Sequence, residues 1–177
     1  GPAMDTIKAP VLIIPDGPQL GVVCDIDDTV MVTHMPRVLV AFWNAFVKQS
    51  FARQAVPGMA ALLNRVQKTN PGAPVIYLST GAWNVVPTLR NFFERHNFPR
   101  GPMLMTDWGP TNTGWFRSGL EHKRTQLRRL MIDLPEVKWL LIGDDGQFDR
   151  IIYGDLAHDH GDKVEAIAIR KLTSSEH

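Results

Sequence analysis

Short apolar runs of four to six residues recur along the chain and alternate with stretches of helical periodicity. Their near-continuous apolar character is typical of strands that are covered on both faces, as in a parallel sheet. The alternation predicts an α/β fold, a three-layer Rossmann-like parallel sheet flanked by helices and joined by right-handed crossovers. The expected strands are GVVCDI (21–26), PVIYLS (74–79), PMLM (102–105), KWLLI (138–142) and VEAIAI (164–169).

The stretches between these runs carry apolar residues at the spacing of one helix face. One of them opens with Pro57, which suits the first turn of a helix. A segment rich in Gly, Thr and aromatic residues has no such periodicity and is expected to be a loop. The expected helices are 36–50, 57–67, 87–96 and 122–132, and the expected loop is 106–119.

The length of 177 residues allows one well-formed hydrophobic core, so a single domain is expected. We expect it over residues 20–172. A lead-in precedes it at 1–19, of which 1–4 resemble a cloning remnant, and a frayed tail follows it at 173–177.

Charge and cysteine content narrow the classes of partner. Nineteen basic residues against eighteen acidic ones leave a net charge of +1. This charge gives no indication of a basic surface for nucleic acid or of a polybasic segment that would attract a membrane. No apolar run reaches the length of a transmembrane segment. The single cysteine, Cys24, excludes an internal disulfide and fits a reducing compartment. A cytoplasmic protein is therefore expected, and peripheral contact with a membrane is left open.

Three carboxylates follow the first expected strand, in the sequence DIDDT. Alternate side chains of a strand share a face, so Asp25 and Asp27 should point to one side and Cys24 to the other. Ligands of open parallel sheets bind outside the carboxyl ends of the strands. The pair is therefore expected where such sheets keep their sites, although Asp27 and Asp28 are also residue types that form turns.

Later strand ends supply groups of complementary chemistry. Ser79 and Thr80 end the second expected strand, Asp144 and Asp145 end the fourth, and Lys123 lies in the helix before the fourth. Phosphoryl transfer to water needs such a set, because one carboxylate attacks phosphorus while a second carboxyl group carries the proton. A hard cation such as Mg²⁺ fits oxygen ligands of this kind.

At these positions the chain resembles the haloacid dehalogenase (HAD) superfamily, whose motifs are Asp-x-Asp-x-Thr, Ser/Thr, Lys and Gly-Asp-Asp. It is more closely similar to the phosphatidate phosphatase catalytic domain of the actin-patch-protein type, a family distantly related to the lipins. The resemblance covers 21–170 and implies a HAD-like fold with at most a minimal cap. It also implies hydrolysis of phosphatidate to diacylglycerol and phosphate. The stretches that carry it are DIDDTVMVT, VPGM, YLSTGAWNVVPTLRNFFERHNFPRGPMLMTDWG, EHK, LLIGDDGQFD and AIAIR.

The resemblance implies a role for each catalytic position. Asp25 would be the nucleophile that forms an aspartyl-phosphate. Asp27 would protonate the leaving alkoxide and then activate water. Ser79 would hold a phosphate oxygen, and Lys123 would steady both the nucleophile and the phosphoryl group.

Binding positions follow from the same resemblance. Mg²⁺ would be bound by the Asp25 side chain, the Asp27 main-chain carbonyl and Asp144, with Asp149 in support. Asp145 stands where the fungal family form has serine, so Asp144 is the preferred ligand at that strand end. The candidates for substrate binding are Thr29, Thr80 and Gly81.

Alternatives to this interpretation come from other classes of site. A calcium loop also begins Asp-x-Asp, but Val30 stands where it requires glycine and Pro36 where it requires glutamate. Composition does not separate a lipid phosphatase from a HAD phosphatase for a soluble phosphomonoester or a phosphoprotein. A receiver-like signalling module also gathers aspartates, Ser/Thr and Lys around Mg²⁺, but it is phosphorylated on the middle strand rather than the first.

The sequence leaves the roles of two pairs of residues open. Ser79 and Thr80 both place a hydroxyl near a strand end, and motif position favours Ser79. Trp115 and Phe116, in the expected loop, are candidates for contact with an apolar substrate or a bilayer surface. Packing against the sheet is the commoner outcome for a tryptophan.

Overall fold

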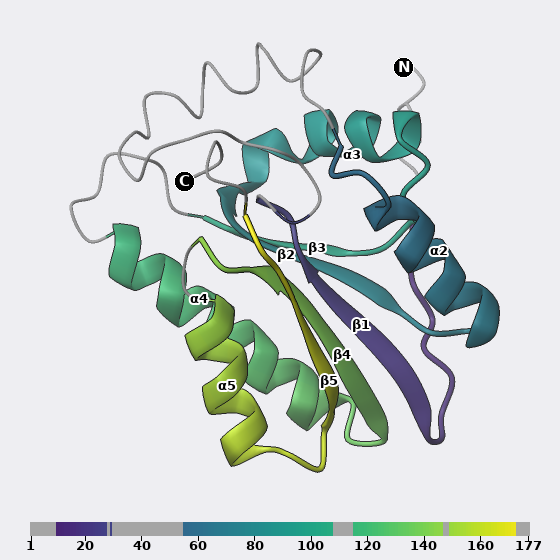
Figure 1. Cartoon of the computed structure of the whole chain (residues 1–177), viewed down its shortest axis with the longest axis vertical. Coiled ribbons are helices and arrows are strands. Elements are labelled where there is room, and N and C mark those ends of the chain that lie inside the picture. Colours follow the sequence, from purple (N-terminus) through teal and green to yellow (C-terminus); the bar gives the residue numbers. More distant parts are fainter. Residues whose placement is uncertain (1–9, 28, 30–54, 108–114, 147–148, 173–177) are drawn as a thin grey trace, which may run out of the picture.

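A five-stranded parallel sheet forms the centre of the computed structural model, with strand order β3-β2-β1-β4-β5 (Figure 1). The structure describes residues 10–27, 29, 55–107, 115–146 and 149–172, and of 115–118 it describes the backbone alone. The strands are β1 (Gln19–Asp25), β2 (Val75–Ala82), β3 (Met103–Thr106), β4 (Val137–Asp144) and β5 (Val164–Arg170). All five expected strands are present, which confirms the α/β class.

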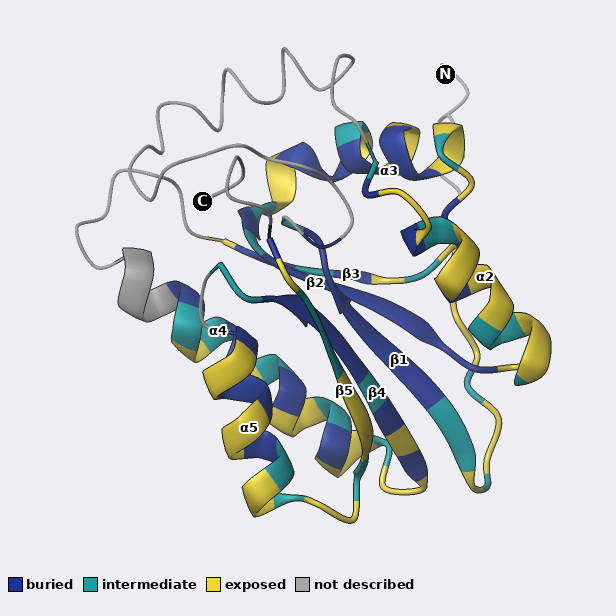
Figure 2. Ribbon diagram, viewed as in Figure 1, coloured by how far each residue is buried: buried dark blue, intermediate teal, exposed yellow. Residues whose placement is uncertain are grey.

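The central strands are the most deeply buried part of the sheet, and the edge strand β5 is partly exposed (Figure 2). Strands buried on both faces need apolar side chains in both directions, which explains the continuous apolar runs of the sequence. The side chains of Tyr77 and Trp139, both fully buried, lie on opposite faces of the sheet.

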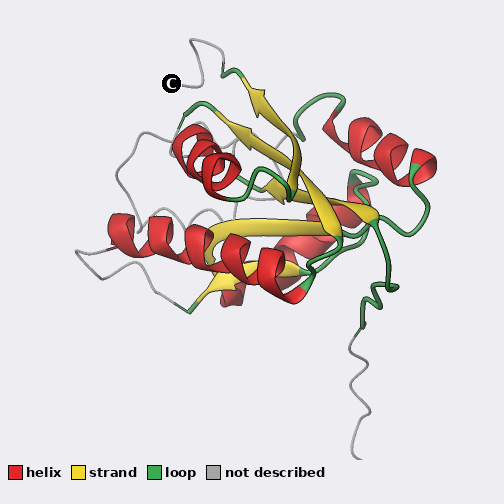
Figure 3. Ribbon diagram, turned by 90° about the horizontal axis from the view of Figure 1, so that it is seen from below, coloured by secondary structure: helices red, strands yellow, loops and turns green. Residues whose placement is uncertain are grey.

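Helices cover both faces of the sheet, which gives three layers (Figure 3). One face carries α2 (Met59–Thr69) and α3 (Val86–Arg95), and a short 3₁₀ helix, η2 (Trp83–Val85), joins β2 to α3. The other face carries α4 (Trp115–Asp133) and α5 (Asp149–Asp159). Among the described residues, no helix is long and apolar enough to cross a bilayer.

Side chains of β1 alternate between the two faces, as the period of a strand requires. Val22 and Cys24 pack in the core beneath α2 and α3, whereas Val23 packs in the core beneath α4 and α5. Asp25 follows this alternation and points to the side of α4 and α5, away from Cys24. The expectation that these two neighbours face opposite ways is confirmed.

The strand order changes direction at β1. The chain first adds β2 on one side of β1, where Val22 pairs with Val75, and later adds β4 on the other side, where Val22 pairs with Leu140. Crossovers that leave in opposite directions open a crevice at the carboxyl ends of the strands between them. The end of β1 is therefore the position where this topology accommodates a ligand.

One expectation about helices was wrong, and one helix was missed. Residues 115–119, expected within a loop, form the start of α4, so Lys123 lies in the third turn of a longer helix. Gly119 permits this, because its absent Cβ lets α4 pass the side chain of Thr80. The helix α5 was not expected. The described part of the chain does not include the expected helix at 36–50, the region of any cap, or the side chains of Trp115 and Phe116.

Gly21 on β1 provides a test of the packing between β1 and β4. Gly21→Ala would place a Cβ 2.6 Å from a ring carbon of Trp139 and 2.7 Å from Cγ1 of Val137. Because Trp139 is fully buried, we expect the free energy of unfolding to fall by about 1–3 kcal/mol in urea titrations. Gly154→Ala is the matched control, because apart from the adjoining backbone of α5 no described atom lies within 4 Å of its Cβ position. It should raise that free energy by about 0.5–1 kcal/mol. Equal effects of the two substitutions would contradict the close packing at Gly21.

Candidate active site

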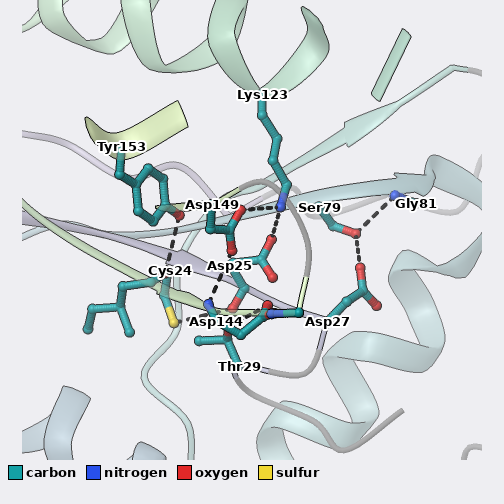
Figure 4. Close-up of polar contacts among 12 residues, drawn as sticks. Cys24, Asp25, Asp27, Thr29, Ser79, Gly81, Lys123, Asp144, Asp149 and Tyr153 are labelled. Carbon is teal, nitrogen blue, oxygen red and sulfur yellow. Dashed lines mark hydrogen bonds and ion pairs between the residues drawn. The ribbon is translucent and has the colours of Figure 1, made fainter. Parts of the chain in front are cut away.

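The ammonium group of Lys123 lies between two carboxylates at the carboxyl end of the sheet (Figure 4). Its Nζ is 2.6 Å from Oδ1 of Asp25 and 2.7 Å from Oδ1 of Asp149. All three side chains are almost completely buried. Charges removed from water cost several kcal/mol each, and close pairing with the opposite charge offsets much of that cost.

Asp149 is held in place by the backbone around it. It is the first residue of α5, where the helix dipole favours a negative charge. Its Oδ2 accepts a hydrogen bond from the backbone N–H of Asp144 at 3.3 Å. A Cβ on Gly143 would lie 2.5 Å from that same oxygen, so the glycine of the Gly-Asp-Asp motif leaves the space that Asp149 occupies.

The two acidic residues at the end of β4 point to different partners. Asp144 is buried, and its carboxylate accepts hydrogen bonds from the N–H of Gly146 at 2.7 Å and from Oγ1 of Thr29 at 3.4 Å. Asp145 instead accepts a hydrogen bond from the N–H of Leu172 at 2.8 Å, beyond the end of β5. Asp144 therefore lies with Asp25 and Asp149, and Asp145 ties β4 to the segment after β5.

Ser79 forms a second set of contacts at the end of β2 (Figure 4). Its hydroxyl donates to Oδ2 of Asp27 at 3.1 Å and accepts from the N–H of Gly81 at 2.9 Å. Ser79 is completely buried, whereas Thr80 is partly exposed and its methyl group faces Gly119. The geometry favours Ser79 over Thr80 as the hydroxyl that belongs to the site.

Burial and charge shift the ionisation of these groups in different directions. Burial raises the pKa of Asp25 well above its usual range, the neighbouring Asp149 raises it further, and Lys123 offsets part of the change. Burial alone would lower the pKa of Lys123, but Asp149 and Asp25 together raise it above its ordinary value. Burial also raises the pKa of the Cys24 thiol, with Asp25 adding to the shift, so Cys24 stays protonated and is no nucleophile.

A divalent cation fits the acidic residues of this site. Single carboxylate oxygens of Asp25, Asp144 and Asp149 all lie within 4.8 Å of one another, and the three side chains are buried. The ammonium of Lys123 contacts two of these carboxylates, those of Asp25 and Asp149. Hard cations with oxygen ligands bind sites of this composition. The cluster is thus compatible with a divalent metal, as the sequence predicted.

The structure brings most of the predicted site residues together. One connected group consists of Asp25, Thr29, Lys123, Asp144 and Asp149. The adjoining group consists of Asp27, Ser79 and Gly81. Thr29 lies against the Asp144 carboxylate, and the roles of Thr29, Thr80 and Gly81 in substrate binding stay predictions.

Sequence reasoning missed two supporting residues of the site. Tyr153 is fully buried on α5, where burial, and secondarily Asp149, raise the pKa of its phenol. Its neutral hydroxyl donates to the carbonyl of Ile142 at 3.2 Å and so fixes α5 against β4. Thr106, at the end of β3, donates to two carbonyls of β2. Tyr153 lies outside the stretches that carry the family resemblance. Thr106 lies within one of them, but no role follows from its place there.

Comparison with known proteins assigns the chain to a family. Residues 20–171 match the sequence profile described as "Phosphatidate phosphatase APP1, catalytic domain". An uncharacterized protein of Schizosaccharomyces pombe is 28% identical over 168 residues, which are 94% of this chain and 27% of that protein. Phosphatidate phosphatase APP1 of Saccharomyces cerevisiae is 26% identical over 162 residues, 88% of this chain and 26% of that protein. The chain thus spans about a quarter of the length of these relatives.

Solved structures share the fold at low sequence identity. One chain of the Pnkp1/Rnl/Hen1 RNA repair complex superposes with a TM-score of 0.58 at 16% identity, covering 96% of this chain and 49% of its own length. The HAD domain of the Legionella pneumophila effector Lem4, an inactive mutant, gives a TM-score of 0.50 at 11% identity, covering 90% and 88%. These likenesses confirm the expected HAD-like fold. With the profile match over nearly the whole chain, the chain belongs to the family of the phosphatidate phosphatase APP1 catalytic domain.

Proposed function

We propose that residues 20–172 form a phosphatase domain that hydrolyses phosphatidate to diacylglycerol and phosphate through a covalent intermediate on Asp25. One observation carries the proposal: a buried lysine between two carboxylates, next to a serine that is hydrogen-bonded to a further carboxylate. Phosphoryl transfer depends on positioning and on charge stabilisation, and this arrangement supplies both. The family match supports phosphatidate as the substrate class.

In the first step, a carboxylate oxygen of Asp25 attacks phosphorus and forms a P–O bond. The ester P–O bond breaks, and the leaving alkoxide takes a proton from the carboxyl group of Asp27. Lys123 and the hydroxyl of Ser79 stabilise the charge on the phosphoryl oxygens. Lys123 also lowers the pKa of Asp25 against the effect of burial, which favours the ionised nucleophile.

In the second step, the Asp27 carboxylate accepts a proton from water, and the water oxygen attacks phosphorus. The P–O bond to Asp25 breaks, so Asp25 returns as a carboxylate and inorganic phosphate leaves. One residue thus serves as acid and then as base, which needs a carboxyl group placed where both the leaving group and water reach it. Before the substrate binds, the 3.1 Å hydrogen bond from Ser79 holds the Asp27 carboxyl group beside the site.

We assign Mg²⁺ to the cluster of Asp25, Asp144 and Asp149, with the main-chain carbonyl of Asp27 as a further ligand. When bound, the cation neutralises carboxylate and phosphate charge. Gly146 and Thr29 hold the Asp144 carboxylate in the orientation that the cluster requires.

The substrate assignment predicts a preference for lipid. With Mg²⁺ present, the chain should hydrolyse phosphatidate in mixed micelles faster than soluble phosphomonoesters or a phosphopeptide, with a rate that depends on the surface concentration of the lipid. Equal turnover of soluble compounds without a surface effect would favour the soluble-monoester alternative.

The assignment of Asp25 as nucleophile predicts that Asp25→Asn lowers the turnover of every substrate by roughly a thousandfold or more, because the amide is no nucleophile. A phosphorylated protein that lasts for minutes without turnover would favour the receiver-like module.

The metal assignment predicts a gain of stability that needs no turnover. Adding Mg²⁺ should raise the free energy of unfolding, by about 2.7 kcal/mol at a hundred times the dissociation constant. Asp144→Asn should weaken this response in urea titrations, because it removes one carboxylate of the cluster. Asp145→Asn is the matched control and should keep the response, since Asp145 bonds to Leu172 instead. The reverse pattern would exchange the roles of the two residues.

The raised pKa of Asp25 predicts a pH-dependent stability in metal-free buffer. Since the folded state binds this proton more tightly than the unfolded chain does, the free energy of unfolding should fall as pH rises above about 4. Asp25→Asn lacks this effect, so its stability relative to the wild type should increase between about pH 4 and 7 in urea titrations with EDTA. A difference that does not change with pH would contradict the expected cost of charging Asp25.

A further inference from the structure

The carboxyl end of β2 departs from regular pairing with β3. Leu78 pairs with Leu104, but Ala82 pairs with Thr106, so three residues of β2 face a single residue of β3 between these pairs. Extra residues on one strand form a bulge, which re-aims the backbone locally and is common beside active sites. The bulged residues are Ser79–Gly81, which we call the phosphate-binding segment because the proposed phosphatase would bind phosphate there.

The side chain of Thr106 holds this bulge from the β3 side. Its Oγ1 lies 3.1 Å from the carbonyl oxygen of Thr80 and 3.2 Å from that of Gly81, so one hydroxyl serves two successive carbonyls. Thr106 is 2% exposed, which leaves little room for water to replace the hydroxyl. Successive carbonyls of a regular strand point in opposite directions, whereas these two converge on one donor.

Fixing the Thr80 carbonyl also fixes the N–H of Gly81, because both belong to one peptide unit. The described chain contains no cis peptide bond, and in a planar trans peptide the C=O and N–H point in opposite directions. With the carbonyl bonded to Thr106, the N–H of Gly81 must point away from β3. On that side it donates to Oγ of Ser79 at 2.9 Å, and Ser79 in turn donates to Asp27.

We propose that Thr106 is a positioning residue of the phosphate-binding segment, whose hydroxyl aims the N–H of Gly81 and thereby the hydroxyl of Ser79 into the site. The inference rests on the proposed phosphatase function. When a phosphate enters, its oxygen would replace Oγ of Ser79 as the acceptor of the Gly81 N–H, and the hydroxyl of Ser79 would rotate from Asp27 to the phosphate. Donors already aimed at the charge cost little reorganisation on binding. Thr106 acts through the Thr80–Gly81 peptide and has no direct contact with the phosphate.

The test compares Thr106→Val, which removes the hydroxyl at nearly constant shape, with Thr106→Ser, which retains it. With Mg²⁺ present, Thr106→Val should weaken the binding of inorganic phosphate about tenfold in calorimetric titrations, which need no turnover. The KM for phosphatidate in mixed micelles should rise in parallel, with a smaller change in kcat. Thr106→Ser should restore both to near the values of the wild type.

Thr69→Val is the matched control. Its hydroxyl also lies near two carbonyls, those of Arg65 and Val66, but within α2 and away from the site. It should leave phosphate binding and KM unchanged. If circular dichroism shows that Thr106→Val does not fold, Thr106→Cys takes its place, because a thiol has similar size and is a weak donor.

Three outcomes would overturn the proposal. A folded Thr106→Val protein with wild-type phosphate affinity and KM would show that the hydroxyl does not aim the segment. An equal loss in Thr106→Ser would assign the effect to side-chain shape. If the wild-type protein neither binds phosphate nor hydrolyses any phosphomonoester, the proposed function fails and this inference fails with it, whereas a failure confined to Thr106 leaves the phosphatase function standing.

Discussion

The contact of Lys123 with Asp25 and Asp149 is the interaction on which the site depends. A buried carboxylate without compensation is costly, and this site gathers three of them around one ammonium. Lys123 comes from α4, Asp25 from β1 and Asp149 from α5, so one cation joins three elements at the end of the sheet. The three buried carboxylates beside this ammonium make the site compatible with a divalent cation.

Glycines at the strand ends allow this close assembly. Gly143 leaves space for Asp149 beside β4, and Gly119 lets α4 approach the end of β2. In each case an added methyl group would meet a side chain of the site or of its support. The positions of the charged groups thus follow from how closely the backbone elements approach one another, and the hydrogen bonds at Asp144 and Ser79 then set their orientation.

The sequence predicted the strands well because each carries a continuous apolar run. It predicted Asp25, Ser79 and Asp144 as candidate site residues because they end three of those runs. It did not predict α5, where Gly154 and charged residues interrupt the apolar pattern of a short helix. Only the family resemblance favoured Asp144 over Asp145, since two neighbouring carboxylates look alike in a sequence until Leu172 lies beside one of them. The part proposed for Thr106 depends on the irregular pairing of β2 with β3, which the apolar pattern of the two strands did not predict.

The place of β1 in the sheet also has a consequence for the order of assembly. The strand that carries Asp25 is made first, yet its two neighbours are β2 and β4, and Gln19 pairs with Val137 across most of the chain. Contacts between such distant segments form slowly, because a long loop must close before they are gained. Asp25 is synthesised long before Lys123 and Asp144, so the candidate site stays incomplete until most of this sequence has been made. The candidate site can therefore assemble only after the contacts between these distant strands have formed.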